Sequence, residues 1–263
     1  MITDQDRATI AAAADAARKA IEPYFRTSLQ IENKLDEGFD PVTAADKASE
    51  RAIREVLSQM APDDAILGEE YGSQASGNGR EWVIDPIDGT RAFIAGFPTW
   101  TVLIGLSVDG EPQLGVIDQP YIDERFIGTA DGTELQRAGQ SRALATSPVA
   151  KLKHAMLATT DPYLFNSDEK AVFDMIRRRC KLHRFGFDAY GYAMLAGGGL
   201  DLVIESGLQP YDVQALIPVI RGAGGVITNW SGGSAAGGGQ VVAAGSPELH
   251  EVALGFLKHV ATR

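Results

Sequence analysis

The chain has 263 residues, with 24 Lys and Arg side chains against 35 Asp and Glu side chains, so its formal net charge at pH 7 is −11. Apolar residues make up 44 % of the chain, which is enough for a chain of this size to bury a large core without disulfides or a structural metal. The single cysteine, Cys180, excludes an internal disulfide framework and a cysteine-rich metal site, and it fits a reducing compartment. The acid excess, without any block of Lys and Arg, argues against a nucleic acid or an anionic membrane as partner.

Targeting segments are not expected from the sequence. The alanine-rich stretch Met1–Ala20 is interrupted by Asp4, Asp6 and Asp15, and it does not resemble a signal peptide. The sequence has no apolar run of about 18 residues, the length that a membrane span requires. We therefore expect a soluble, cytoplasmic protein.

The first part of the chain predicts two helices followed by a series of strands. The helices run from an N-cap at Thr3 to near Pro23 and from Thr43 to Met60, where Ala45, Ala48, Ala52, Val56, Leu57 and Met60 form an apolar stripe. Strands are expected at Ala65–Gly68, Glu81–Asp85, Trp100–Val108, Gln113–Asp118 and Arg125–Thr129, with hairpin turns at Asp109-Gly110 and Asp131-Gly132. This pattern predicts helices packed on an antiparallel sheet.

After the polar segment Ser141–Pro148, strands and helices alternate. The expected strands are His154–Thr160, Lys181–Phe185, Asp201–Glu205, Val226–Thr228 and Val241–Ala244, and the expected helices are Asp168–Arg179, Ala189–Ala196, Tyr211–Ala223 and Pro247–Val260. Such alternation predicts a second, mixed α/β sheet covered by helices. We therefore expect two halves, residues 1–145 and 146–263.

Two carboxylates three residues apart lie at the end of one predicted strand. In the segment from Trp82 to Thr90, Pro86 is expected to end the strand after Asp85, and Asp88-Gly89 forms a turn. Strand ends of this kind hold ligands in α/β folds, and the glycine lets backbone N–H groups approach an anion. Taken alone, the pattern Asp-Pro-x-Asp-Gly is more typical of a solvated turn.

Further acidic residues occur at element ends. Glu69 and Glu70 follow a predicted strand, Asp212 opens a predicted helix, and Asp46 lies near the start of another. Asp46 and Asp212 are equally consistent with favourable charges at helix N-termini. If the side chains converge, they form a carboxylate cluster without His or Cys, which is the ligand set of Mg²⁺ or Mn²⁺.

These motifs resemble the inositol monophosphatase family of Mg²⁺-dependent, lithium-sensitive phosphatases. The resemblance lies in Glu69-Glu70, in the segment from Trp82 through Asp85-Pro86-x-Asp88-Gly89-Thr90 to Phe93, and in Asp212 with the later Gly222-Ala223-Gly224-Gly225. A three-part signature in the right order is more specific than any single motif. The resemblance implies a layered αβαβα sandwich, usually dimeric.

Roles for individual residues follow from this resemblance. It implies that the metal ligands are Glu69, Asp85, the carbonyl of Ile87, Asp88 and Asp212, which hold two to three Mg²⁺ ions, with Mn²⁺ a possible substitute. Asp46 and Thr90 match the pair that orients and helps to activate the attacking water, with Glu69 beside them, and Gly89 and Thr90 match the phosphate-binding turn. The reaction is direct attack of a metal-activated water on a phosphate monoester. Bound cations allow an acidic chain to take a phosphorylated metabolite.

Departures from the common family pattern resemble the histidinol-phosphate phosphatase branch, which belongs to histidine biosynthesis. They are Arg91-Ala92-Phe93, Pro210-Tyr211-Asp212 and the segment Gly186-Phe187-Asp188-Ala189-Tyr190. Asp188 and Glu205 are expected to bind the cationic alcohol by charge-assisted hydrogen bonds, although Asp188 is equally consistent with a helix N-cap. Arg184 is a further substrate-binding candidate, with a surface salt bridge as its alternative role.

Two other functions remain open. One is phosphatase activity on inositol-1-phosphate or on a 3′(2′),5′-bisphosphate nucleotide. The other is a non-catalytic regulatory binding protein on the same fold, against which the intact set of ligand residues argues.

Overall fold

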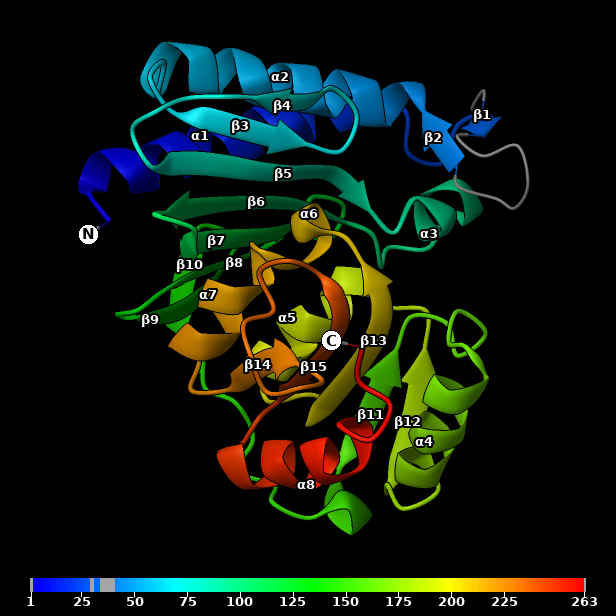
Figure 1. The fold of residues 1–263 in the computed structure, drawn as a ribbon. Helices are drawn as coiled ribbons and strands as arrows, with labels where there is room; N and C mark the ends of the chain where they lie inside the picture. Colours follow the sequence, from blue (N-terminus) through cyan, green and yellow to red (C-terminus); the bar gives the residue numbers. More distant parts are fainter. Residues whose placement is uncertain (1, 29–30, 34–40, 263) are drawn as a thin grey trace.

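The computed structural model describes residues 2–28, 31–33 and 41–262, which form five stacked layers (Figure 1). Helices α1 (Asp4–Ile21) and α2 (Ala44–Met60) cover one face of an eight-stranded sheet. Between this sheet and a second, five-stranded sheet lie α5 (Asp188–Ala196), α6 (Pro210–Val213) and α7 (Leu216–Gly222). Helices α4 (Ser167–Arg177) and α8 (Pro247–Leu257) cover the outer face of the second sheet. This is the αβαβα sandwich expected from the sequence.

The first sheet has the strand order β10-β9-β8-β7-β6-β5-β3-β4. Its strands are β3 (Ala65–Gly68), β4 (Gly72–Gln74), β5 (Arg80–Asp88), β6 (Thr101–Val108), β7 (Glu111–Gln119), β8 (Glu124–Thr129), β9 (Gly132–Arg137) and β10 (Gln140–Ala143). Neighbouring strands of this sheet run antiparallel except β3 and β5, which run parallel. The predicted site residues at the ends of these two strands therefore lie at the same edge of the sheet. A separate two-stranded ladder joins β1 (Ile31–Asn33) to β2 (Pro41–Thr43).

The second sheet is mixed and has the order β12-β11-β13-β15-β14. Its strands are β11 (Met156–Thr159), β12 (Leu182–Phe185), β13 (Leu202–Leu208), β14 (Val226–Asn229) and β15 (Gly239–Ala244). β11 runs parallel to both β12 and β13, whereas β15 is antiparallel to both β13 and β14. A single 3-10 turn, η1 (Leu152–His154), leads into β11.

The first two helices begin where the sequence predicts. Thr3 and Thr43 are their N-caps, and each forms a capping box with the aspartate three residues later, Asp6 or Asp46. The apolar stripe predicted for α2 is wrong in part, because the buried face consists of Ala45, Asp46, Ser49, Glu50, Ile53 and Leu57. Polar side chains take core-facing positions there because each has partners: the Ser49 hydroxyl, for example, donates to the carbonyl oxygen of Pro86 at 3.2 Å.

Four other expectations are corrected. β5 continues through Pro86 to Asp88, because a register shift against β6 between Asp85 and Asp88 removes the need for the missing N–H. The segment after Gly89 forms a short helix, α3 (Thr90–Ala95), and the helix predicted over 211–223 is divided into α6 and α7. The polar segment after Gln140 contains the edge strand β10.

A row of three glycines lets α7 and its N-terminal flank lie directly on the first sheet. Gly105, Gly115 and Gly128 are cross-strand neighbours on β6, β7 and β8. A Cβ atom on Gly115 would overlap the backbone of Ala215, and one on Gly128 would overlap the backbone of Val219. The close approach fixes the chain just after Asp212, which is one of the predicted metal ligands.

The two halves of the chain share one core. The largest buried cluster combines Leu103 and Ile117 of the first sheet with α5, α7 and Val203 of the second sheet. The proposed boundary near residue 145 falls in the connection between β10 and β11, and therefore separates the two sheets along the chain. Within the part of the chain that the structure describes, no helix is both long and apolar enough to cross a membrane.

Candidate active site

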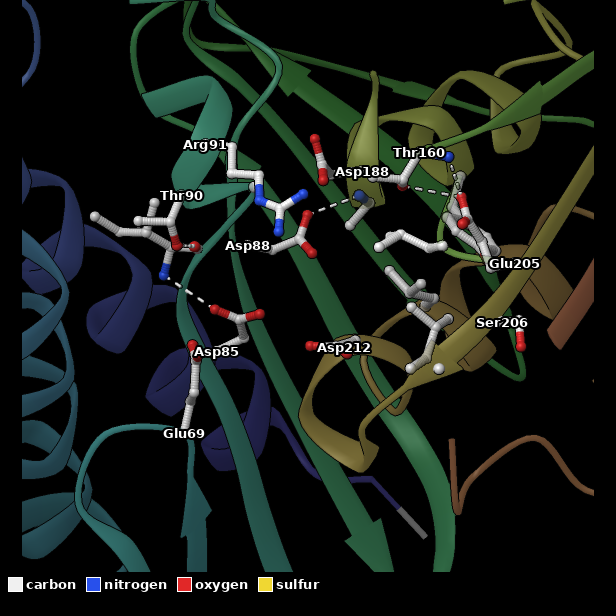
Figure 2. A pocket seen from close by; sticks show the side chains of 18 residues that line it. Glu69, Asp85, Asp88, Thr90, Arg91, Thr160, Asp188, Glu205, Ser206 and Asp212 are labelled. Atoms are coloured by element: carbon white, nitrogen blue, oxygen red, sulfur yellow. Dashed lines mark hydrogen bonds between the residues drawn. The ribbon is translucent and has the colours of Figure 1, made fainter. Parts of the chain in front are cut away.

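A cavity of about 250 Å³ opens where the two halves meet, and it contains most of the predicted site residues. Figure 2 shows Glu69 and Asp85 on one side of it and Thr160 and Glu205 on the other, with Asp88, Asp188 and Asp212 between them. These side chains come from both sheets and from the helices between them. The carboxylates predicted from separate motifs therefore do converge.

Three of the carboxylates form a cluster that fits a metal ion. One oxygen from each of Asp85, Asp88 and Asp212 lies within 4.8 Å of the others. Each side chain is anchored by a backbone N–H donor: Ile87 donates to Asp85 Oδ1 at 3.1 Å, Ala189 to Asp88 Oδ2 at 2.7 Å, and Gln209 to Asp212 Oδ2 at 2.6 Å. An oxygen-only set of this kind suits a hard divalent cation.

The charge balance of the cluster also points to a cation. Burial and the neighbouring carboxylates raise the pKa of Asp85 and of Asp88 well above the ordinary value. Burial raises the pKa of Asp212 to about 7. A divalent cation among the three groups would offset both the loss of hydration and the mutual repulsion that cause these shifts.

Glu69 lines the cavity next to this cluster, at the end of β3. Its turn is held by the buried carboxylate of Glu50 on α2, which accepts hydrogen bonds from the N–H groups of Glu70 at 2.7 Å and Tyr71 at 3.2 Å. Gly68 is required at this point, because a Cβ atom there would overlap the Glu50 carboxylate. Glu50 was not predicted from the sequence, since a buried glutamate carries no motif of its own.

Asp46 lies behind Glu69, at the start of α2, and does not itself line the cavity. Its Oδ2 accepts from the N–H of Thr43 at 2.8 Å and from the Thr43 hydroxyl at 2.6 Å. Its Oδ1 is buried and has no hydrogen-bond partner among the described residues. Burial, with a further contribution from the charge of Glu69, raises the pKa of Asp46 to about 6. One oxygen thus caps the helix and the other remains for a ligand or a water.

The predicted phosphate-binding turn lies at the start of α3. Gly89 is its N-cap with φ of +81°, a conformation that favours glycine, and a Cβ atom there would come within 3.0 Å of the Asp188 carboxylate. The hydroxyl of Thr90 donates to the carbonyl oxygen of Ile87 at 3.2 Å. Gly89, Thr90 and Ile87 all line the cavity.

Glu205 lies across the cavity from Glu69 and Asp85, and Asp188 lies between them, beside Asp88 (Figure 2). Asp188 has φ of +47°, a left-handed conformation that a non-glycine residue rarely adopts, and its side chain does not cap α5. The N–H of Ala189 is instead bound by Asp88, so the N-cap alternative for Asp188 does not hold. Burial raises the pKa of Asp188 to about 6, while the nearby charge of Arg91 opposes the shift.

Glu205 is a buried carboxylate held by two threonines. Its Oε1 accepts from the N–H of Thr160 at 2.7 Å and from the Thr160 hydroxyl at 3.0 Å, and its Oε2 accepts from the Thr159 hydroxyl at 3.2 Å. Burial nevertheless raises its pKa to about 8. The raised pKa favours the protonated form in the empty cavity, and a cationic group bound beside Glu205 would lower this pKa again.

Arg184 is not brought to the cavity. It lies on β12, is exposed, and is not among the residues that line the cavity. Arg91, which the sequence marked only as a departure from the family pattern, does line it.

Tyr192 and Thr160 are cavity residues that the sequence analysis missed. Tyr192 follows Asp188 by four residues on one helix, and this spacing was the available signal.

The fold and the site together define a metal-dependent phosphatase. The family model described as "Inositol monophosphatase family" matches residues 3–260, and the chain belongs to this family. The metal dependence of the family agrees with the carboxylate cluster, which could bind a metal ion.

Several proteins in the comparisons are similar over almost the whole chain. The chain is 42 % identical to the bifunctional phosphatase IMPL2, chloroplastic, of Arabidopsis thaliana, over 94 % of this chain and 73 % of the plant protein. It is 36 % identical to a histidinol-phosphatase of Chlorobaculum parvum, with 83 % of each chain covered. A solved structure described as an inositol monophosphatase from Zymomonas mobilis has a TM-score of 0.85 and 40 % identity, and covers 98 % of this chain and all of that chain.

Proposed function

We propose that the protein is a Mg²⁺-dependent histidinol-phosphate phosphatase, which converts histidinol phosphate and water to histidinol and phosphate. The observation that carries the proposal is that Asp188 and Glu205 line the same cavity as the carboxylate cluster. Histidinol phosphate carries an ammonium group and a titratable imidazole, which acidic side chains bind by charge-assisted hydrogen bonds. The similarity to proteins named as histidinol-phosphatases in three organisms supports the same substrate.

Glu69, Asp85, Asp88, Asp212 and the carbonyl of Ile87 would hold two to three Mg²⁺ ions. When bound, these ions supply Lewis acidity that stabilises the charge on the phosphoryl, attacking and leaving oxygens. Mn²⁺ has similar ligand preferences and is the expected substitute.

The protein's own side chains and backbone orient the attacking water and bind the phosphate. In this proposal the Oδ1 of Asp46, which has no partner among the described residues, accepts one hydrogen bond from the attacking water. The hydroxyl of Thr90 already donates its proton to the carbonyl of Ile87, so a lone pair of its oxygen accepts the second hydrogen bond from the attacking water. Both protons of the water are then held, and a lone pair is directed at phosphorus. The N–H groups of Gly89 and Thr90 bind the phosphate at the start of α3.

The choice of substrate is tested by phosphate release in the presence of Mg²⁺. Histidinol phosphate, inositol-1-phosphate and adenosine 3′,5′-bisphosphate are compared by kcat/KM with the same enzyme preparation. The proposal predicts at least a tenfold preference for histidinol phosphate. A higher kcat/KM on either of the other substrates contradicts it.

Inositol-1-phosphate is the second candidate substrate. It is favoured by the 40 % identity to the Zymomonas mobilis protein, which is described as an inositol monophosphatase. This alternative needs no positive charge on the alcohol, and the hydroxyl groups of inositol would bind Asp188 and Glu205 as donors.

A regulatory binding protein on the same fold is the third candidate, and two of the relatives are named Nus factor SuhB. Asp88→Asn distinguishes a catalyst from a binding protein. Because even indirect partners of a metal ligand contribute about 10–100-fold, we expect the variant to lose at least about 100-fold in kcat with Mg²⁺. The control is Asp109→Asn, which removes the same charge from an exposed Asp-Gly turn that accepts Asn. Equal activity of both variants would argue for the regulatory role.

A homodimer is proposed from the family resemblance. Light scattering of the purified protein measures the dimer directly.

A further inference from the structure

Tyr192 presents a buried hydroxyl that the proposed reaction does not use. It lies on α5, one turn after Asp188, and its side chain lines the cavity although the residue is only 2 % exposed. Its Oη atom has no hydrogen-bond partner among the described residues. A buried hydroxyl without a partner costs free energy that a phenylalanine at the same position would avoid. The hydroxyl therefore needs an explanation outside the packing of the ligand-free fold.

The surroundings of this hydroxyl are those of the active site. Burial raises the pKa of Tyr192 far above the ordinary value, and the nearby carboxyl groups of Glu205, Asp88 and Asp212 raise it further. The hydroxyl thus keeps its proton and can donate a hydrogen bond. These carboxyl groups come from β13, β5 and α6, so Tyr192 lies near three of the elements that line the cavity.

These neighbours already have donors of their own. Both oxygens of Glu205 accept from Thr159 or Thr160, and Asp88 accepts from the N–H of Ala189. An acceptor for Tyr192 is therefore most simply supplied by a molecule in the cavity.

We propose that Tyr192 is a specificity-determining residue, whose hydroxyl donates a hydrogen bond to an acceptor on the alcohol portion of the substrate. The inference rests on the proposed phosphatase function and adds a hydrogen-bond donor to a cavity that Asp188 and Glu205 also line. A group that both accepts and donates fits this arrangement: the unprotonated nitrogen of a neutral imidazole accepts from Tyr192, while its N–H donates to a carboxylate. A hydroxyl-rich alcohol would satisfy the same two partners.

A matched control lies two residues away on the same helix. The hydroxyl of Tyr190 donates to Glu124 Oε2 at 2.7 Å, and Tyr190 does not line the cavity. Tyr192→Phe and Tyr190→Phe therefore remove the same atom from two settings. The Tyr190 hydroxyl has a partner within the fold, and the Tyr192 hydroxyl has none in the part of the chain that the structure describes.

The experiment measures kcat/KM of wild type and both variants on histidinol phosphate and on phenyl phosphate, whose alcohol portion offers only its ester oxygen. For Tyr192→Phe we expect the ratio of kcat/KM for histidinol phosphate to that for phenyl phosphate to fall about fivefold or more, mainly through KM. For Tyr190→Phe the ratio stays at the wild-type value. An unchanged ratio for Tyr192→Phe, or an equal loss on both substrates, overturns the inference.

Thermal unfolding of the same proteins without substrate gives a readout that a purely structural role would move. We expect Tyr190→Phe to lower Tm, because it loses a hydrogen bond to a carboxylate, and Tyr192→Phe to leave Tm unchanged or raise it. A fall in Tm for Tyr192→Phe as large as that for Tyr190→Phe overturns the inference. If wild type prefers inositol-1-phosphate, the proposed substrate is wrong, and the role of Tyr192 is decided by the same ratio with that substrate.

Discussion

At the scale of single residues, Asp46 and Asp212 show how one carboxylate serves the local fold and the site together. Each is the third residue of its helix and accepts a hydrogen bond from the N-cap backbone, Thr43 for Asp46 and Gln209 for Asp212. The helix-terminus interpretation and the ligand interpretation were alternatives in the sequence. The structure confirms the helix-terminus interpretation, and the ligand interpretation is compatible with it, because capping takes one of the two oxygens and leaves the other available.

Glu205 leads to a prediction of pH dependence. Its pKa is raised to about 8 in the folded protein by burial, against about 4.3 for an unperturbed glutamate. Between these values the folded state retains a proton that the unfolded chain releases. The stabilisation is therefore complete below the unfolded pKa and is lost as the pH rises towards 8.

Glu205→Gln mimics the protonated carboxyl at every pH. We expect the free energy of unfolding of wild type, relative to this variant, to fall by about 2 kcal/mol or more between pH 5 and pH 8. Urea unfolding at the two pH values measures it. Glu55→Gln, which removes a glutamate from the exposed face of α2, serves as the control for loss of a charge. Parallel pH profiles for wild type and Glu205→Gln would contradict the prediction.

At the scale of elements, the decisive contact is between α7 and the row of glycines on the first sheet. The sequence shows Gly105, Gly115 and Gly128 as isolated glycines in predicted strands, which indicate close backbone approach but not what approaches. The structure shows that the chain at Ala215 and Val219 lies on them. Asp212 is held at the cavity by this contact.

Gly115→Ala is expected to displace the start of α7 from the sheet. We expect a loss of about 1–3 kcal/mol in the free energy of unfolding, as overpacking of a core produces, together with weaker Mg²⁺ binding because Asp212 moves. Denaturant unfolding and calorimetric Mg²⁺ titration measure the two effects. Gly77→Ala, in a loop position with nothing near the added Cβ atom, should change neither. A Gly115→Ala protein that binds Mg²⁺ as wild type does would show that this contact does not position the site.

At the scale of the whole molecule, the two sheets depend on a common core. Side chains of α5 and α7 pack on Leu103 and Ile117 of one sheet and on Val203 of the other. Neither sheet can expose its inner face without exposing the shared apolar layer. The two halves read from the sequence are therefore folding partners as well as successive segments of the chain.

We expect both halves to unfold in one transition. The tryptophans report on each half, since Trp82 and Trp100 are buried in the first part and Trp230 in the second. Fluorescence of a Trp230→Phe protein reports on the first half, and that of a Trp82→Phe/Trp100→Phe protein on the second. Each fluorescence midpoint in urea should match the midpoint of far-UV circular dichroism measured on the same protein. Two separated transitions within either protein would show that the halves fold independently.

The residues alone predicted helices packed on an antiparallel sheet and a second, mixed sheet covered by helices, whereas the five-layered arrangement and the convergence of the carboxylates were implied by the resemblance to the inositol monophosphatase family. Helical periodicity, Asp-Gly turns and acidic residues at strand ends are local signals, and each specifies a local conformation or a ligand type. The cluster of Asp85, Asp88 and Asp212 was predicted from motifs more than 100 residues apart because each motif carries its own signature.

Only the tertiary structure decided which side chains share the cavity. Arg184 and Asp188 lie four residues apart, yet one is exposed on β12 and the other lines the cavity at the start of α5. Asp88 rather than Asp188 binds the N–H of Ala189 in the first turn of α5, and the hydroxyl of Tyr192 has no partner among the described residues. The packing of distant elements determines both features. Charge, burial and hydrogen bonding at a site depend on neighbours distant in sequence, which no local pattern encodes.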